Sequence, residues 1–149
     1  MHIEGRIVGS YDENRLTRAL DDIPQLAETV PGLQDLTISE DRVEAKMVVP
    51  LPFMQLKSRI SGTITRHASG IQLTVKGRPE TLAGLFECQV AIDQIVEEVL
   101  QGFQYQLDIK TSGRLASLGE AMLGNVSRKQ AQLFEDNLRR LLDQENGHA

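Results

Sequence analysis

The last third of the chain carries one apolar stripe, and this stripe limits how the chain can fold. Between Arg114 and Leu142, apolar or small residues recur at helical spacing for about eight turns. The stripe consists of Leu115, Leu118, Gly119, Met122, Leu123, Val126, Leu133 and Phe134. The spacing predicts a single long amphipathic helix. Because such a helix has one apolar face, another element of the chain must cover it.

Most of the preceding chain alternates between apolar and polar residues, which is typical of strands with one solvated face. The alternation is clean from Val43 to Val49 and resumes from Met54 to Ile64. We predict strands at residues 2–8, 33–39, 43–49, 54–64, 71–75, 86–92 and 103–109. The repeated strand–helix rhythm of a parallel sheet is missing from this order. The pattern therefore predicts a curved antiparallel sheet of six to seven strands.

Two short helices are predicted after the first strand. Asp12 is suited to cap the first helix, which carries Leu16 and Leu20 on its apolar face. The second helix follows Pro24 and covers residues 25–30, because Pro31 and Gly32 stop it. The fold class is therefore α+β, with two short N-terminal helices and one long C-terminal helix packed across the sheet.

Residues 93–102 do not follow the alternation of apolar and polar residues. Their apolar residues come in adjacent pairs, Ile95 with Val96 and Val99 with Leu100. We interpret this segment as a long hairpin that turns near Glu97 and Glu98. Glutamate is an uncommon turn residue, so a helical turn is the alternative interpretation.

Length and charge narrow the class of protein. The 149 residues predict one domain, residues 1–149, and the net charge of −5 argues against binding to nucleic acid. The first residues do not resemble a signal peptide, and no stretch approaches the roughly 20 apolar residues of a membrane span. Cys88 is the single cysteine, which fits a reducing compartment. We expect a cytoplasmic protein.

The sequence offers no set of residues typical of a standard catalytic mechanism. His2, His67 and His148 are expected to be solvated, and they lack the spacing of a zinc site. Cys88 lies in an alternating stretch, so we expect a buried structural thiol. The pairs Glu135–Arg139 and Asp136–Arg140 are expected on the exposed side of the last helix. We therefore expect no enzyme activity, no cofactor and no metal.

The interior of the predicted fold could be a filled core or a cavity. Small residues at inward positions leave volume that dense protein interiors do not normally tolerate. They are Ala45, Ser58, Gly62, Gly77 and Gly119. Because apolar clefts are the usual sites for small molecules, we expect a ligand cavity between the sheet and the last helix.

The predicted lining of this cavity is mainly apolar. It comprises Met47, Leu56, Ile60, Leu73, Val90, Tyr105, Leu118, Met122 and Val126. We expect Tyr105 to form a hydrogen bond with a carbonyl or hydroxyl group of the ligand. Gln130 and Asn137 could add polar contacts at one end. The apolar loop 50–54 could gate the cavity, contact a membrane or partner, or pack over the end of the sheet.

Three segments carry a resemblance to a known family. They are Leu26-Ala27 with Val30-Pro31-Gly32-Leu33, then Ser61-Gly62-Thr63-Ile64, and Ser112-Gly113-Arg114-Leu115-Ala116-Ser117-Leu118-Gly119. Together with the order of elements, they resemble the carbon monoxide dehydrogenase G-subunit family, which is part of the START-like, or SRPBCC, superfamily. The resemblance covers essentially the whole chain and implies the helix-grip fold. Its motifs are structural and name no catalytic residue.

The resemblance also implies a function. Such proteins enclose an apolar small molecule, such as a lipid or quinone, and serve a molybdenum hydroxylase partner. Of the family's alternating glycines after the fifth strand, only Gly77 and Gly84 remain, and the chain ends at Ala149 without the membrane-reaching tail of some members. We therefore do not expect a membrane anchor. Two other functions stay open, a protein–protein adaptor with a filled core and a START-like cyclase or hydrolase.

Overall fold

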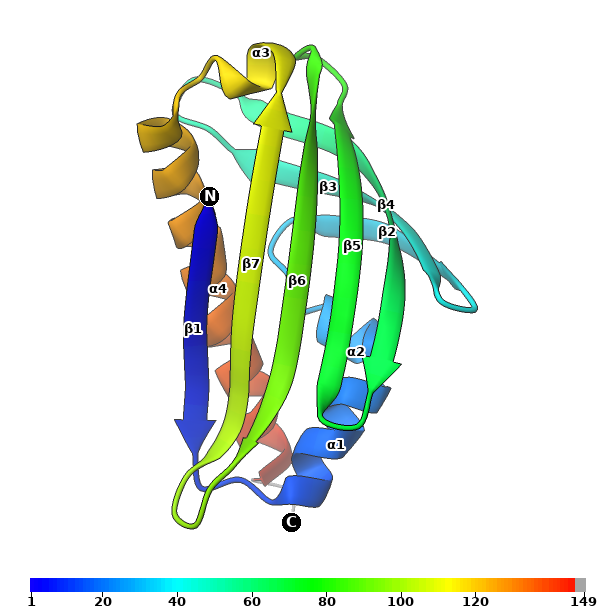
Figure 1. Ribbon diagram of the computed structural model, residues 1–149, viewed down its shortest axis with the longest axis vertical. Helices are drawn as coiled ribbons and strands as arrows, with labels where there is room; N and C mark the ends of the chain where they lie inside the picture. Colours follow the sequence, from blue (N-terminus) through cyan, green and yellow to red (C-terminus); the bar gives the residue numbers. More distant parts are fainter. Residues whose placement is uncertain (147–149) are drawn as a thin grey trace.

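The computed structural model describes residues 1–146 and confirms the helix-grip fold (Figure 1). His148 therefore lies outside the described residues. The elements are β1 (His2–Gly9), α1 (Glu13–Asp21), α2 (Ile23–Ala27), β2 (Leu33–Ser39), β3 (Arg42–Pro50), β4 (Gln55–His67), β5 (Gly70–Pro79), β6 (Gly84–Val96), β7 (Gln101–Ser112), α3 (Gly113–Ala116) and α4 (Glu120–Asn146).

All neighbouring strands pair antiparallel in one seven-stranded sheet of order β1-β7-β6-β5-β4-β3-β2. From β2 to β7 each strand pairs with its successor in the chain. The first strand pairs with the last, so β1 and β2 form opposite edges of the sheet. In Figure 1, α4 lies on the far side of β1 and β7, where β2 and β3 also curve round. The curved sheet therefore has an inner side that holds the helices.

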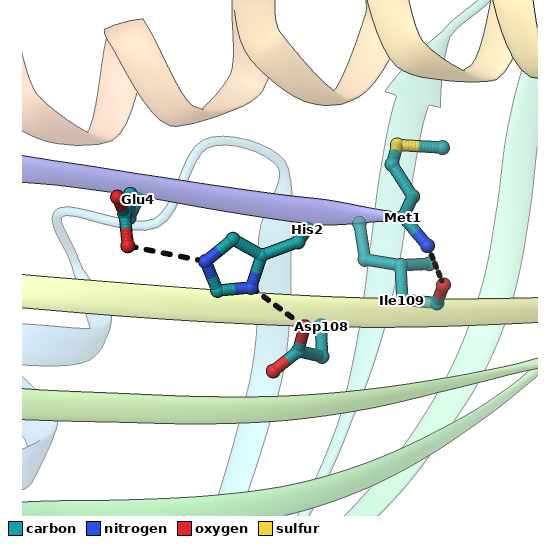
Figure 2. Close-up of polar contacts among 5 residues, drawn as sticks. All are labelled: Met1, His2, Glu4, Asp108 and Ile109. Atoms are coloured by element: carbon teal, nitrogen blue, oxygen red, sulfur yellow. Dashed lines mark hydrogen bonds and ion pairs between the residues drawn. The ribbon is translucent and has the colours of Figure 1, made fainter.

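Polar contacts fasten β1 to β7 at one end of the pair (Figure 2). The amino group of Met1 donates to the carbonyl oxygen of Ile109 at 2.9 Å. His2 Nδ1 lies 2.7 Å from Asp108, and His2 Nε2 lies 3.1 Å from Glu4. The hydrogen bond with Asp108, and then that with Glu4, raises the pKa of His2. His2 is exposed, as predicted.

Two aspartates determine where the N-terminal helices begin. The side chain of Asp12 accepts from Asn14 N at 3.2 Å, which confirms the predicted cap of α1. Asp22 caps α2 in the same way, accepting from Gln25 N at 3.1 Å. Pro24 therefore lies in the first turn of α2, where a missing N–H group is tolerated. The predicted second helix, residues 25–30, is wrong in its bounds: it spans Ile23–Ala27.

The long C-terminal helix is confirmed, but its predicted start at Arg114 is wrong, because the structure interrupts the helical stretch at Gly119. Helix α3 ends at Ala116 and α4 begins at Glu120. Gly119 has φ of +92°, a conformation that other residues rarely adopt. The predicted apolar stripe therefore does not lie on one continuous helix. Within α4, its member Leu133 is 38% exposed.

The hairpin interpretation of residues 93–102 is confirmed. Strand β6 continues to Val96, and β7 begins at Gln101. Glu97 N donates to Leu100 O at 2.9 Å and closes the turn. Among the described residues, no helix is both long and apolar enough to cross a membrane.

The buried apolar side chains form two separate clusters. The larger cluster packs α1, α2 and the C-terminal half of α4 against one end of the sheet, with Ile7, Leu16, Phe103 and Leu138 fully buried. The smaller cluster lies at the other end and joins Leu51, Leu56 and Leu115. The predicted apolar loop 50–54 is thus divided, because Leu51 is buried and Phe53 is 59% exposed. The inner side of the sheet between the clusters is the candidate site.

Candidate functional site

A cavity of about 340 Å³ lies on the inner side of the sheet. Inward side chains of β3 to β7 form one wall, including Met47, Ile60, Leu73 and Val90. Helix α2, one face of α4, strand β2 and neighbouring residues such as Leu51 and Leu115 complete the wall. The volume lies near the lower end of the range for small-molecule sites, about 300–1,000 Å³.

Two rows of paired residues show that this space is a cavity rather than a filled core. Each row contains three inward side chains on β5, β6 and β7. The rows are Ile71–Ile92–Tyr105 and Val75–Cys88–Ile109. The first row is buried, whereas the second remains partly exposed. Dense packing would cover both rows, so the inner face is closed at one end and open to the cavity at the other.

The small residues that predicted the cavity do not all produce it. The ring of Phe86 occupies the place that a Gly77 side chain would take, so the expectation that Gly77 leaves space is wrong. Gly119 lies at the helix break instead of on a helix face. Ala45 does line the cavity, and the short side chains of Ser127 and Ala131 face it from α4. The apolar stripe predicted from the sequence does not include these two helix residues.

Seven predicted site residues lie in the cavity wall: Met47, Leu56, Ile60, Leu73, Val90, Tyr105 and Val126. The other two do not. Leu118 packs against the smaller cluster, and Met122 is partly buried outside the wall. Leu118 precedes the helix break at Gly119, and Met122 lies on α4 beside the face that lines the cavity. The structure adds Leu26, Ala27, Val30, Leu107 and Ile109, of which Leu107 and Ile109 continue the alternation that contains Tyr105. Ligand contact by any of these residues stays a prediction.

Tyr105 and Glu135 form a hydrogen-bonded pair at the closed end. The Tyr105 hydroxyl donates to Glu135 Oε1 at 2.6 Å, and burial together with this carboxylate raises the pKa of Tyr105. Gly5 permits the pair, because a side chain at that position would collide with both residues. Glu135 was expected on the exposed side of the helix beside Arg139. It is instead half-buried, and Arg139 donates to Val8 O at 3.2 Å.

This pair changes what Tyr105 offers to a ligand. Its proton is already donated to Glu135, so the hydroxyl oxygen is available to a ligand only as an acceptor. Asn137 is likewise engaged, because its Nδ2 donates to Thr29 O at 3.1 Å. Gln130 differs from both. It lies in the cavity wall, and its Oε1 is buried without a hydrogen-bond partner among the residues that the structure describes.

The remaining chemistry of the wall is limited. Cys88 lies in it, and burial raises the pKa of this thiol to about 11, so the thiol is protonated at neutral pH. Glu44 is the one charged residue among the described residues of the wall, and its side chain is exposed. Within residues 1–146, no three His, Cys, Asp or Glu side chains are grouped as metal ligands would be.

A second depression lies outside this site. It is about 450 Å³ in volume and lies between the junction of α1 and α2 and the turn from β2 to β3. Its rim carries Asp21, Asp41 and Arg66, and Arg66 pairs with Asp21 at 3.8 Å. Exposed ion pairs of this kind are typical of a solvated surface groove.

Three solved structures are similar in fold. A conserved protein of Geobacillus kaustophilus has a TM-score of 0.82 at 18% identity, with 97% of this chain and 96% of that chain covered. The Zhui aromatase/cyclase of a Streptomyces species has a TM-score of 0.69 at 10% identity, with 96% and 93% covered. A Thermus thermophilus protein has a TM-score of 0.63 at 8% identity, with 94% and 95% covered. These identities show the fold alone.

The comparison with families is more specific. None of the curated proteins matches the chain. The family model that describes the G subunit of carbon monoxide dehydrogenase (CoxG) matches residues 5–142 and confirms the resemblance seen in the sequence. The chain therefore belongs to the CoxG family.

Proposed function

We propose that the protein binds a hydrophobic small molecule, such as a lipid or a quinone, without altering it chemically. The apolar cavity between the sheet and α4 carries this proposal. Its wall leaves inward side chains such as Val75 and Ile109 partly exposed. Covering apolar surface contributes about 25 cal/mol per Å², so an apolar ligand gains free energy wherever it replaces water on this wall.

Family membership supports a second part of the proposal. The ligand is held for a molybdenum hydroxylase of the carbon monoxide dehydrogenase type, to which the protein is accessory. The description of the family supports this partner. Co-purification of the tagged full chain with such an enzyme from the native host is the direct test. A hydroxylase that never co-purifies, even after mild cross-linking, contradicts the partnership and leaves the ligand proposal unaffected.

An enzyme acting on an apolar substrate is the second candidate, because one similar fold is that of an aromatase/cyclase. Tyr105 and Glu135 would then be its acid–base pair, since they share a proton at the end of the cavity. Binding alone returns every ligand unchanged, whereas catalysis gives a product that disappears in Glu135→Gln.

Native mass spectrometry of the purified full chain tests the ligand proposal, followed by extraction and identification of any bound species. We expect one apolar molecule per chain, recovered chemically unchanged. A mass without ligand, together with no thermal shift on adding quinones or long-chain alcohols, contradicts the proposal. That result would favour the adaptor with a filled core and direct the search to protein partners.

A further inference from the structure

Gln130 is a polar residue in the middle of the apolar face that α4 presents to the cavity. The residues of this face recur every three or four positions, as one face of a helix requires. They are Leu123, Val126, Ser127, Gln130, Ala131 and Phe134. Val126 and Phe134 lie one turn before and one turn after Gln130, so the amide is placed along the cavity and not at the end of the helix.

The side-chain oxygen of Gln130 is buried and has no hydrogen-bond partner among the described residues. A buried acceptor without a donor is unfavourable, and most such groups in native proteins are paired. Neighbouring polar groups do not supply the donor. Tyr105 donates to Glu135, and Asn137 donates to Thr29 O. The acceptor is therefore unpaired, and a turn of the Gln130 side chain, which lies in the cavity wall, would present it to a molecule that enters the cavity.

Charge restricts which molecule this can be. Among the described residues, the wall contains no lysine, arginine or histidine, and the side chain of Glu44 is exposed. Within these residues, its one cation is the amino group of Met1, which is exposed and donates to Ile109 O. Because the amino group of Met1 is exposed, an ionised carboxylate buried beside Gln130 would have no buried cation to pair with, which is strongly unfavourable. A neutral polar group does not carry this penalty, provided that it forms a hydrogen bond.

We propose that the cavity selects a neutral ligand with an apolar body and a hydrogen-bond-donating head that donates to Gln130 Oε1. A lipid alcohol or the hydroquinone form of a quinone has such a head, whereas the oxidised quinone has only acceptors. The apolar body lies against the inward side chains of β5 to β7. This inference rests on the proposed function and deepens it, because it states the chemistry of the ligand's head.

Three probes of equal chain length test the inference on the full chain. Decanol offers a donor, decyl methyl ether lacks one, and decanoate carries a charge. We expect calorimetric titration to give decanol an affinity about 5- to 30-fold higher than that of the ether, and decanoate the weakest affinity. Gln130→Leu should bind decanol and the ether equally. Gln132→Leu, on the exposed side of the same helix, is the control and should keep the preference.

A second measurement separates binding from folding. Because Gln130→Leu removes an unpartnered buried acceptor, the variant without ligand should unfold at a higher temperature than the native chain. If it does not fold, Gln130→Met serves in its place. Equal binding of decanol and its ether to the native chain, or tightest binding of decanoate, overturns the inference and leaves the proposed function standing. Failure of all three probes to bind overturns the proposed function itself.

Discussion

Replacing Val90 by phenylalanine tests whether the inner face of the sheet borders free space. Val90 lies on β6 between Leu73 of β5 and Leu107 of β7, and all three side chains face the cavity. Adding a ring to a filled core costs about 1–3 kcal/mol, because neighbouring side chains must move. A cavity of about 340 Å³ can accept the ring without such movement.

Val90→Phe is therefore expected to leave the free energy of unfolding unchanged or to raise it. Phenylalanine has four more side-chain carbon atoms than valine, and burying about half of them, at about 0.8 kcal/mol each, contributes about 1.5 kcal/mol. Phenylalanine is also well suited to a strand. The matched control is Leu16→Phe, because Leu16 is fully buried in the larger cluster. There we expect a loss of about 1–3 kcal/mol, so the two variants should differ by at least about 1 kcal/mol and by up to about 4 kcal/mol.

Urea denaturation gives the free energies of unfolding, provided that the variants share one m-value. For a chain of this length, 1 kcal/mol corresponds to about 2–4 °C in Tm. Val90→Phe should also lose affinity for decanol, because the ring occupies the ligand's volume. A loss of stability equal to that of Leu16→Phe would show that the wall is already covered, and the reasoning from exposed rows would fail.

Further predictions concern three residues, Tyr105, His2 and Cys88. Tyr105→Phe should lower the free energy of unfolding at pH 7 by about 1–2 kcal/mol, because half-buried Glu135 loses its donor; an unchanged urea midpoint would contradict this. Because the pKa of Tyr105 is raised in the folded state, its contribution is present below pH 10 and declines at higher pH, which thermal melts in alkaline buffers can follow. In an NMR titration, the pKa of His2 should lie above 6.5 and fall in Asp108→Asn; its stabilising effect is complete below pH 6.5 and is lost as pH rises through the raised pKa. Cys88, with a pKa of about 11, should react with a thiol reagent at pH 8 more slowly in the folded chain than in urea, and more slowly still with decanol bound; equal rates would place the thiol outside the cavity.

Most of the fold could be predicted from the alternation of apolar and polar residues, because a one-residue shift moves every side chain of a strand to the other face. The apolar positions at Val75, Cys88, Val90 and Ile109 therefore fixed which face turns inward. The hairpin at Glu97 could also be predicted, because alternating strands on both sides require a turn between them. These are properties of neighbouring residues, so one sequence is enough to expose them.

Properties that depend on distant residues were not recoverable. Tyr105 and Glu135 come from β7 and α4, and neither local pattern states that they meet. Alternation placed Gly77 on the inner face, but it could not state that the Phe86 ring lies over it. The helix break at Gly119 was not predicted, because Leu118 and Met122 keep helical spacing across it. A glycine after a short helical turn is a known stop signal, and here the continuous stripe concealed it.

The two clusters divide the molecule into a part that stabilises the fold and a part that can remain hollow. At the closed end, α1 and the C-terminal half of α4 cover Ile71, Ile92 and Tyr105, which supplies dense packing. At the other end, Leu51, Leu56 and Leu115 join the loop before β4 to α3. The row Val75–Cys88–Ile109 between them is left partly uncovered. A ligand that binds only the folded state raises the free energy of unfolding by RT ln(1 + [L]/Kd). Substitutions at the closed end should therefore change stability with or without ligand, whereas those in the wall should act mainly on the increment that the ligand adds.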